Sequence, residues 1–227
     1  MTRTIKFAPK EFYHLYNRGT EKRDICTSSK DYERFLALMF LCNQSEVPAR
    51  TRGKTLPELT AFQTGSELID IAVYCLMPNH IHILAKEKEE NGISKFMQKL
   101  MTGYTMYFNK KYERTGVLFQ GTFKATHANN DPYLSYLVSY IHLNPIKLIE
   151  PEWKEIGIND LNLAEKYLNN FKYSSYLDYQ DQERIEKNII NKNSLPKYFK
   201  SRLDFRKSVI EWLSYPHARL NLANKIG

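Results

Sequence analysis

Cysteine is scarce in this sequence, and long apolar runs are absent from it. The 227 residues include three cysteines, an odd number, and no two of them form a Cys-x-x-Cys pair. The sequence therefore predicts neither a disulfide framework nor a cysteine zinc site, which fits a reducing compartment. The first residues lack the apolar core of a signal peptide, and no apolar stretch approaches a membrane span in length. We expect a cytoplasmic protein that is neither secreted nor inserted into a membrane.

A complete phosphate-binding P-loop is also absent. Residues 52–55, Arg-Gly-Lys-Thr, match the end of that motif, but its first glycine would fall at Pro48 and no predicted strand precedes it. They belong to a polar stretch, residues 45–66, which proline and glycine interrupt and which predicts a loop with little regular structure. The sequence therefore excludes an NTPase of the P-loop class.

Basic and aromatic residues, by contrast, are abundant. The chain has 33 Lys and Arg against 25 Asp and Glu, a net charge of +8, and 13% of its residues are aromatic. This combination is typical of proteins that hold phosphate backbones and stack bases. Because many proteins that bind no nucleic acid share this composition, it favours a nucleic-acid partner without establishing one.

Hydrophobic periodicity predicts an α+β fold, and a hydrophobic content of 42% is enough for one good-sized core. Alternating residues predict strands at residues 11–19, 69–73, 81–84 and 117–125. Helical spacing predicts helices at residues 29–41, 92–108 and 131–144. The order β-α-β-β-α-β-α is typical of a ferredoxin-like split βαβ fold, which we expect to have an antiparallel sheet with helices on one face.

The last part of the sequence has a different character. Residues 178–194 are polar and rich in Asn and Lys, and a basic amphipathic segment follows them. We therefore divide the chain into a domain at residues 1–177 and a basic helical extension at residues 178–227. The extension either packs against the fold, with a secondary role in DNA binding, or clamps DNA. The basic side chains available to it include Lys197, Lys200, Arg202, Arg206 and Lys207.

Two histidines, His80 and His82, stand one residue apart at the start of a predicted strand, directly after a bend at residues 77–79. Because strand side chains alternate between faces, both rings lie on one face and can share a metal ion. Two hydrogen-bonded histidines on a polar face produce the same pattern, so the pair alone does not distinguish these structures. A metal site needs a third ligand.

A helix face later in the chain carries Tyr133, Leu137, Tyr140 and Asn144, which are spaced by four, three and four residues. Tyr140 and Asn144 therefore lie one turn apart. A tyrosine on an apolar helix face usually packs in the core with its hydroxyl satisfied. With 16 tyrosines in the chain, periodicity alone does not single out Tyr140.

Four ordered segments resemble the REP-associated tyrosine transposases, a branch of the single-tyrosine HUH transposases related to the IS200-like elements. The segments are residues 13–19, 77–82, 118–124 and 140–147, and the resemblance extends over roughly residues 10–177. It implies that residues 1–177 form an HUH transposase domain, an enzyme that cleaves DNA and transfers its strands through a tyrosine nucleophile.

The resemblance also implies roles for single residues. His80 and His82 match the His-hydrophobic-His metal motif of the family, and Asn144 matches the polar residue that completes its metal site. Tyr140 matches its nucleophile. One motif differs, because Thr122 stands where the family has arginine, and this leaves the role of that strand open.

Single-stranded DNA with hairpins is the partner that the resemblance implies, and Mg²⁺ or Mn²⁺ is the implied cofactor. The reaction would be a transesterification through a 5′-phosphotyrosine, in DNA transposition or repeat-element processing. We expect a nucleoid-associated monomer or homodimer. The candidate DNA contacts are Tyr13, Tyr16, Arg18, Lys95, Lys99, Gln120 and Lys124.

Two other functions stay open on the sequence. The first is a domesticated protein that binds structured single strands without cutting them. The second is a metal-dependent phosphodiesterase in which water replaces the tyrosine.

Overall fold

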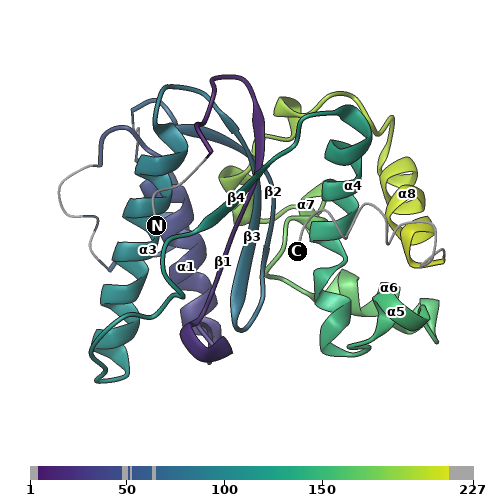
Figure 1. The fold of residues 1–227 in the computed structure, drawn as a ribbon, viewed down its shortest axis with the longest axis horizontal. Coiled ribbons are helices and arrows are strands. Elements are labelled where there is room, and N and C mark those ends of the chain that lie inside the picture. The colour runs from purple at the N-terminus through teal and green to yellow at the C-terminus, as the bar shows by residue number, and fades with distance from the viewer. Residues whose placement is uncertain (1–4, 48–50, 52, 63–64, 215–227) are drawn as a thin grey trace.

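A four-stranded antiparallel sheet lies at the centre of the computed structural model, which describes residues 5–47, 51, 53–62 and 65–214 (Figure 1). The strands follow the order β2-β3-β1-β4, and each neighbouring pair is antiparallel. This is the strand order of a ferredoxin-like fold, so the predicted α+β class is confirmed. The strands are β1 (Phe12–Arg18), β2 (Ile69–Leu76), β3 (His80–Glu87) and β4 (Lys124–His127).

Helices connect the strands and continue beyond the last one. No helix in the described part of the chain is long and apolar enough to cross a membrane. The α-helices are α1 (Ser29–Cys42), α2 (Leu56–Thr60), α3 (Gly92–Lys111), α4 (Asp131–His142), α5 (Trp153–Ile156), α6 (Leu161–Asn170), α7 (Tyr176–Tyr179) and α8 (Arg202–Ser214). Single 3-10 turns are η1 (Thr20–Lys22), η2 (Asn144–Leu148), η3 (Ile185–Ile189) and η4 (Lys192–Ser194).

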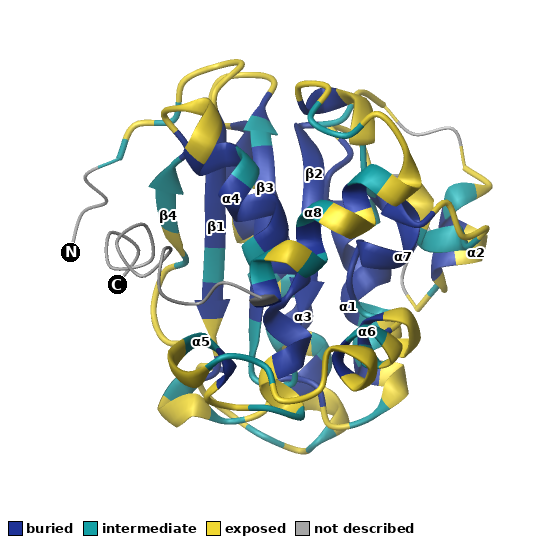
Figure 2. Cartoon of the chain, turned by 90° about the vertical axis from the view of Figure 1, so that its right-hand side faces the viewer, coloured by how far each residue is buried: buried dark blue, intermediate teal, exposed yellow. Residues whose placement is uncertain are grey.

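Helices cover both faces of the sheet, which corrects the expectation of helices on one face. Helices α1 and α3 lie on one side, whereas α4 and α8 lie across the other (Figures 1 and 2). The physical reason is that all 8 residues of β2 are buried, so apolar side chains on both faces of the strand need cover. The two cores include Leu15, Phe35, Ile83 and Phe96 on the α1 and α3 side, and Ala72, Leu84, Leu137 and Ile141 on the α4 side.

Two local predictions from the sequence need a correction. The expected loop or insertion at residues 45–66 has little regular structure, as predicted, but it contains the short helix α2, which begins after a capping box formed by Thr55 and Glu58. Of the expected strand at residues 117–125, only Lys124 and Ala125 belong to a strand, which is β4. The residues before them form a turn. Gly121 has a φ of 69°, a left-handed conformation that interrupts a strand.

The free edge of β2 is covered by the chain that follows α6. The backbone N–H of Leu76 donates to Tyr173, and that of Ser175 donates to Tyr74, at 2.9 and 3.0 Å. Further along, the N–H of Asn191 donates to the β2 backbone at 2.8 Å. This pairing satisfies backbone groups that an open edge would expose.

The C-terminal helix α8 packs on α4, which favours the packing role expected for the extension. Its residues Phe205, Val209 and Leu213 are buried in the core that α4 also lines. Arg206, one of the basic side chains considered for a DNA clamp, pairs with Glu165 of α6. The division between residues 177 and 178 stays a prediction.

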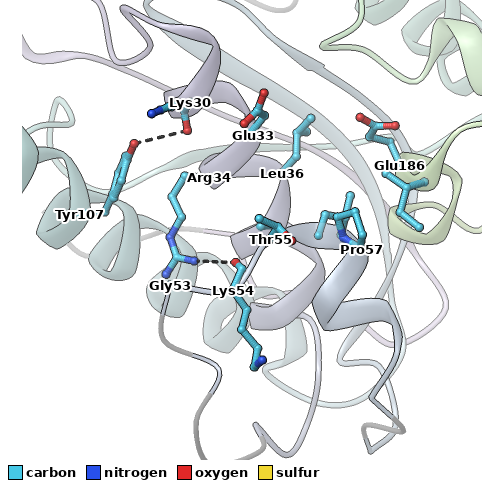
Figure 3. A pocket seen from close by; sticks show the side chains of 13 residues that line it. Lys30, Glu33, Arg34, Leu36, Gly53, Lys54, Thr55, Pro57, Tyr107 and Glu186 are labelled. Carbon is cyan, nitrogen blue, oxygen red and sulfur yellow. Dashed lines mark hydrogen bonds between the residues drawn. The ribbon is translucent and has the colours of Figure 1, made fainter.

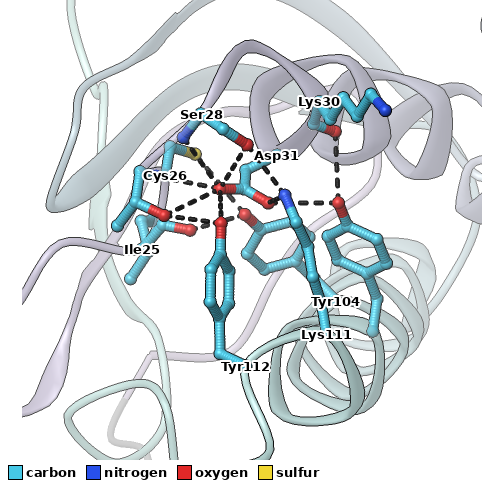
Figure 4. A network of polar contacts seen from close by, with 10 residues as sticks. Ile25, Cys26, Ser28, Lys30, Asp31, Tyr104, Lys111 and Tyr112 are labelled. Carbon is cyan, nitrogen blue, oxygen red and sulfur yellow. Dashed lines mark hydrogen bonds and ion pairs between the residues drawn. The ribbon is translucent and has the colours of Figure 1, made fainter.

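A buried carboxylate ties α1 to α3 (Figure 4). Asp31 is fully buried, and its oxygens accept hydrogen bonds from Lys111 at 2.6 Å, Tyr112 at 2.7 Å and Tyr107 at 3.0 Å. It also accepts from the backbone N–H of Ser28 at 2.9 Å, as part of the capping box of α1. Burial alone would raise the pKa of Asp31, but these hydrogen bonds outweigh it and hold the pKa well below its ordinary value.

We expect Asp31→Asn to lower the free energy of unfolding at pH 7 by about 3 kcal/mol, because it leaves buried donors without an anion. The folded pKa lies below the unfolded value. The stabilisation is therefore complete above about pH 4 and is lost as the pH falls through the folded pKa. Urea unfolding of wild type and variant between pH 7 and pH 3 measures both effects. The control is Glu33→Gln, an exposed carboxylate on α1, and equal midpoints for wild type and Asp31→Asn at pH 7 would contradict the assignment.

Candidate active site

His80 and His82 lie at the start of β3 and point to the face of the sheet that α4 covers. Their ring centroids are 4.9 Å apart. Ile81 between them is fully buried on the opposite face, in the core with α1 and α3. In the strand register His80 is opposite Arg18 and His82 is opposite Tyr16, so β1 brings a basic and an aromatic residue beside the two rings.

The orientation of His80 is set by Asn79, a residue that the sequence indicated only as part of a bend. The side-chain N–H of Asn79 donates to the backbone carbonyl of Lys22 at 3.3 Å, which turns the amide oxygen of Asn79 toward His80. His80 Nδ1 lies 2.6 Å from that oxygen and must be the donor. In a neutral imidazole this leaves the lone pair on Nε2.

A second histidine partner, His14, lies behind His82. His14 Nε2 and His82 Nδ1 are 2.8 Å apart, so one of the two rings donates to the other. His14 is almost fully buried, and its Nδ1 has no hydrogen-bond partner among the described residues. When His82 is the donor, its Nε2 lone pair is free, as a metal ligand requires.

Burial keeps the three histidines neutral. It lowers the pKa of His80 to about 4, and the charges of Lys147 and Lys154 act in the same direction. Burial also lowers the pKa of His14 to about 3, and it holds the pKa of His82 well below its ordinary value. Neutral imidazoles at pH 7 are the form that binds metal ions.

Helix α4 brings Tyr140 against these rings. The helix begins after Asn130, whose side chain accepts from the N–H of Tyr133, and proline occupies its first turn. The Tyr140 ring lies edge-on at 5.7 Å from His82 and 6.0 Å from His14, measured between centroids. Burial raises the pKa of the Tyr140 hydroxyl, and a hydrogen bond from Asn144 partly offsets the shift.

Asn144 connects Tyr140 with His80. It follows α4 in the 3-10 turn η2 rather than in the helix itself, and it is almost fully buried. Its side-chain N–H donates to the backbone carbonyl of Tyr140 at 2.8 Å, which leaves the amide oxygen for other partners. Asn144 also lies near His80, and its side chain raises the pKa of that histidine against the larger effect of burial.

These donors fit a divalent cation. Two neutral imidazoles and one amide oxygen are donors that suit such an ion, and three protein donors would leave coordination positions for oxygen atoms of a substrate. No group of three or more His, Cys, Asp or Glu that suits a metal occurs among the described residues, so an ion held by these two histidines would need a donor of another kind, and the amide oxygen of Asn144 is available. His14 contacts His82 through Nε2 and can orient that ring as a metal ligand, whereas His14 Nδ1 lacks a partner.

A cavity of about 370 Å³ opens beside the histidines. Four of the predicted DNA contacts line it together with His80 and His82, and the Arg18 Nε donates to the Gln120 side chain at 2.6 Å. The backbone N–H of Gln120 also donates to the carbonyl of Arg18, which fixes the irregular turn before β4 beside β1. The four contacts are Tyr16, Arg18, Gln120 and Lys124, and Lys22 adds a further cation.

The other three predicted DNA contacts do not reach this cavity. Tyr13 is almost fully buried on the opposite face of β1, where its hydroxyl accepts from the N–H of Ala8. Lys95 and Lys99 lie on α3, which covers that same opposite face, and Lys99 donates to the backbone of Gln44. Alternation along β1 explains the outcome for Tyr13, because it separates neighbours onto different faces.

A second cavity, of about 570 Å³, lies between α1, α2 and η3 on the side away from the histidines (Figure 3). Its lining includes Gly53, Lys54 and Thr55, the end of the incomplete P-loop motif, whereas Arg52 lies outside the described residues. The Thr55 backbone N–H and hydroxyl both donate to Glu58, so these groups cap a short helix. The exclusion of a P-loop fits this geometry.

The IS200-like transposase family model matches residues 38–144. This range contains both histidines, Tyr140 and Asn144. The resemblance to the IS200-like transposases is confirmed. No curated protein sequence matches the chain.

One of the similar solved structures shares the fold. A REP-associated tyrosine transposase bound to a REP hairpin is similar over 82% of this chain and 90% of its own, with a TM-score of 0.51 and 11% identity. At this identity the likeness shows the fold alone. A tRNA(His) guanylyltransferase from Saccharomyces cerevisiae covers 87% of this chain and 86% of its own at 13% identity, but its TM-score of 0.37 carries no argument.

Sequence reasoning missed three residues at this site. His14 belonged to a recognised motif, and its strand position, two residues before Tyr16, was enough to place it on the same face. The bend residue Asn79 gave no sequence signal for its contact with His80. Lys154 lies beyond the family match, and its ammonium is 3.9 Å from the centroid of the Tyr140 ring.

We expect His80 to carry its proton on Nδ1 at neutral pH, because Asn79 presents an oxygen to that atom. Replacing Asn79 by Ala removes this acceptor, and the ring should then populate both tautomers. Two-bond ¹⁵N–¹H NMR spectra of the histidine side chains measure the tautomer directly. The signals of His127, which bonds to Glu11 just before β1, serve as the internal control. A wild-type His80 protonated on Nε2 would contradict the geometry.

Proposed function

We propose that the chain is a DNA transposase that acts as a single-strand DNA endonuclease and ligase, with Tyr140 as its nucleophile. The observation that carries this proposal is the position of Tyr140, whose ring lies 5.7 Å from His82 and whose backbone carbonyl accepts a hydrogen bond from Asn144 in η2. A nucleophile, two imidazoles and an amide are thus gathered from β3, α4 and η2. This grouping suits phosphoryl transfer.

His80, His82 and Asn144 would hold a divalent metal ion, Mg²⁺ or Mn²⁺, in the proposed enzyme. When bound, such an ion polarises a phosphodiester and offsets charge on its oxygens. Two nitrogen ligands favour Mn²⁺ intrinsically, whereas cellular abundance favours Mg²⁺. The protein contributes fixed ring orientations, because Asn79 and His14 each engage the Nδ1 atom of one ligand histidine.

Tyr140 would attack the phosphorus of a DNA phosphodiester. The phenolic oxygen forms the new bond to phosphorus and the bond from phosphorus to the 3′ oxygen breaks. The phenol loses one proton and the departing 3′ oxygen gains one, so the product is a 5′-phosphotyrosine beside a free 3′-hydroxyl. The ester retains the energy of the broken bond, so religation requires no ATP.

The DNA would enter through the cavity beside the histidines. Arg18, Lys22 and Lys124 supply positive charge there, and Tyr16 supplies a ring on which an unpaired base can stack. These side chains suit single-stranded DNA next to a hairpin, because unpaired bases expose their faces. In this proposal the enzyme is cytoplasmic and associated with the nucleoid, and it is a monomer or a homodimer.

We expect the protein to bind Mn²⁺ in the absence of DNA, and His80→Asn and His82→Asn each to abolish that binding. Electron paramagnetic resonance detects the loss of the free Mn²⁺ signal as protein is added. The matched control is His127→Asn, on β4, which should bind as the wild type does. Undiminished binding in His80→Asn and His82→Asn would remove these two residues from the site.

We expect a covalent adduct between the protein and DNA that survives denaturation. The substrates are hairpin-bearing single-stranded oligonucleotides with Mn²⁺, and denaturing gels report the adduct. Tyr140→Phe removes the attacking oxygen and should reduce adduct formation to background, whereas Tyr136→Phe, on the same helix, is the matched control.

The outcomes of this assay separate the alternatives. Cleavage that survives in Tyr140→Phe would overturn the tyrosine assignment and favour a phosphodiesterase that uses water. Binding without cleavage, with Mg²⁺ or Mn²⁺, would favour a domesticated protein that recognises structured single strands.

A further inference from the structure

Lys154 lies against the proposed nucleophile although it comes from a helix outside the family match. Helix α5 is anchored by Trp153, which is buried in the core shared with α4. The next residue along, Lys154, extends over Tyr140, with its ammonium 3.9 Å from the ring centroid. A cation thus covers one side of the tyrosine.

This cation has no carboxylate partner. Neither Lys154 nor Lys147 forms an ion pair with any carboxylate in the described part of the chain. The charge of Glu155 acts on Lys154 only from a longer distance. Burial and the neighbouring Lys147 lower the pKa of Lys154 to about 7. Two adjacent cations without an anion are unfavourable in the free protein.

The positive charges of Lys154 and Lys147 act on the histidines of the site. Lys154 lowers the pKa values of His14, His80 and His82 through its charge, and Lys147 does the same for His80 and His82. The pair therefore lies near enough to act on an anion held between the histidines and Tyr140. The cavity beside the histidines does not include either lysine, so this charge is separate from that of Arg18 and Lys124.

We infer that Lys154 and Lys147 form a binding site for a DNA phosphate beside Tyr140, an inference that rests on the proposed function. The phosphate supplies the anion that the two ammonium groups lack in the free protein. Lys154 also positions the Tyr140 ring through its contact with the ring face. Neither lysine forms or breaks a covalent bond in this role.

A metal-free binding experiment tests the site without any need for cleavage. The probe is a 20-nucleotide oligothymidylate, and fluorescence anisotropy gives its affinity across a range of NaCl concentrations. Lys154→Met should weaken binding about three- to tenfold and reduce the slope of log affinity against log salt by about one, as the loss of one phosphate contact does. Lys166→Met, an exposed lysine on α6, is the matched control and should leave the slope unchanged.

A second variant and a stability measurement guard against a folding defect. Lys147 is exposed, so Lys147→Met should fold normally and should also reduce the slope. Lys154→Met should melt at or above the wild-type temperature, because it removes a partly buried cation that has no carboxylate partner. Unchanged slopes in both variants would overturn the inference, and so would a Lys154→Met variant that melts well below wild type while it keeps the wild-type slope.

The covalent assay then distinguishes this inference from the proposed function. Lys154→Met should form the Tyr140 adduct about 10²-fold more slowly than the wild type in a single turnover, in the range found for the loss of one electrostatic contact to a transition state. If the wild type forms no adduct at all, the proposed function fails, whereas the salt slopes still decide whether the lysine pair binds phosphate.

Discussion

The alternation of side chains along β1 and β3 is the constraint on which the rest of the molecule depends. These two strands pair at the centre of the sheet, so most of their side chains are buried in one layer or the other. On one face Leu15 and Ile83 belong to the core with α1 and α3. On the other face His14 and His82 meet α4. A shift of either strand by one residue would exchange apolar and ionisable side chains, which burial forbids.

Burial then determines the protonation of the site. Desolvation removes the charge from the histidines, so they act as hydrogen-bonding and ligating groups rather than as cations. The N–H of His80 has an acceptor in Asn79, and His14 and His82 share one hydrogen bond, whereas His14 Nδ1 has no partner among the described residues. Lys154 has no carboxylate partner either, and burial and the neighbouring Lys147 lower its pKa to about 7. Unlike the histidines, it therefore still carries part of its charge at neutral pH. The proposed DNA phosphate would supply the anion that this lysine lacks in the free protein.

The sequence predicted the parts of this arrangement that depend on local periodicity. Strand alternation placed His80 and His82 on one face, and helix periodicity placed Tyr140 one turn before Asn144. The sequence did not predict which helices cover which face of the sheet. The apolar pattern of β2 indicates that both of its faces are buried, but not which helices pack on them. Nor could the sequence predict the contact of Lys154 with Tyr140, which depends on how Trp153 docks α5 in the core. Tyr13 was misplaced because its motif was considered without the alternation of its own strand.

The position of Tyr140 depends on the other side of α4. His142, two residues further along, is fully buried and lies 2.8 Å from the Ser175 hydroxyl through its Nε2. That hydroxyl also accepts from the backbone N–H of Tyr74 on β2, so α4 is connected to the sheet edge through one serine. Phe205 of α8 packs against His142 with ring centroids 5.2 Å apart. The chain beyond the family match therefore fixes the rotation of α4, and with it the distance from the Tyr140 ring to the histidines.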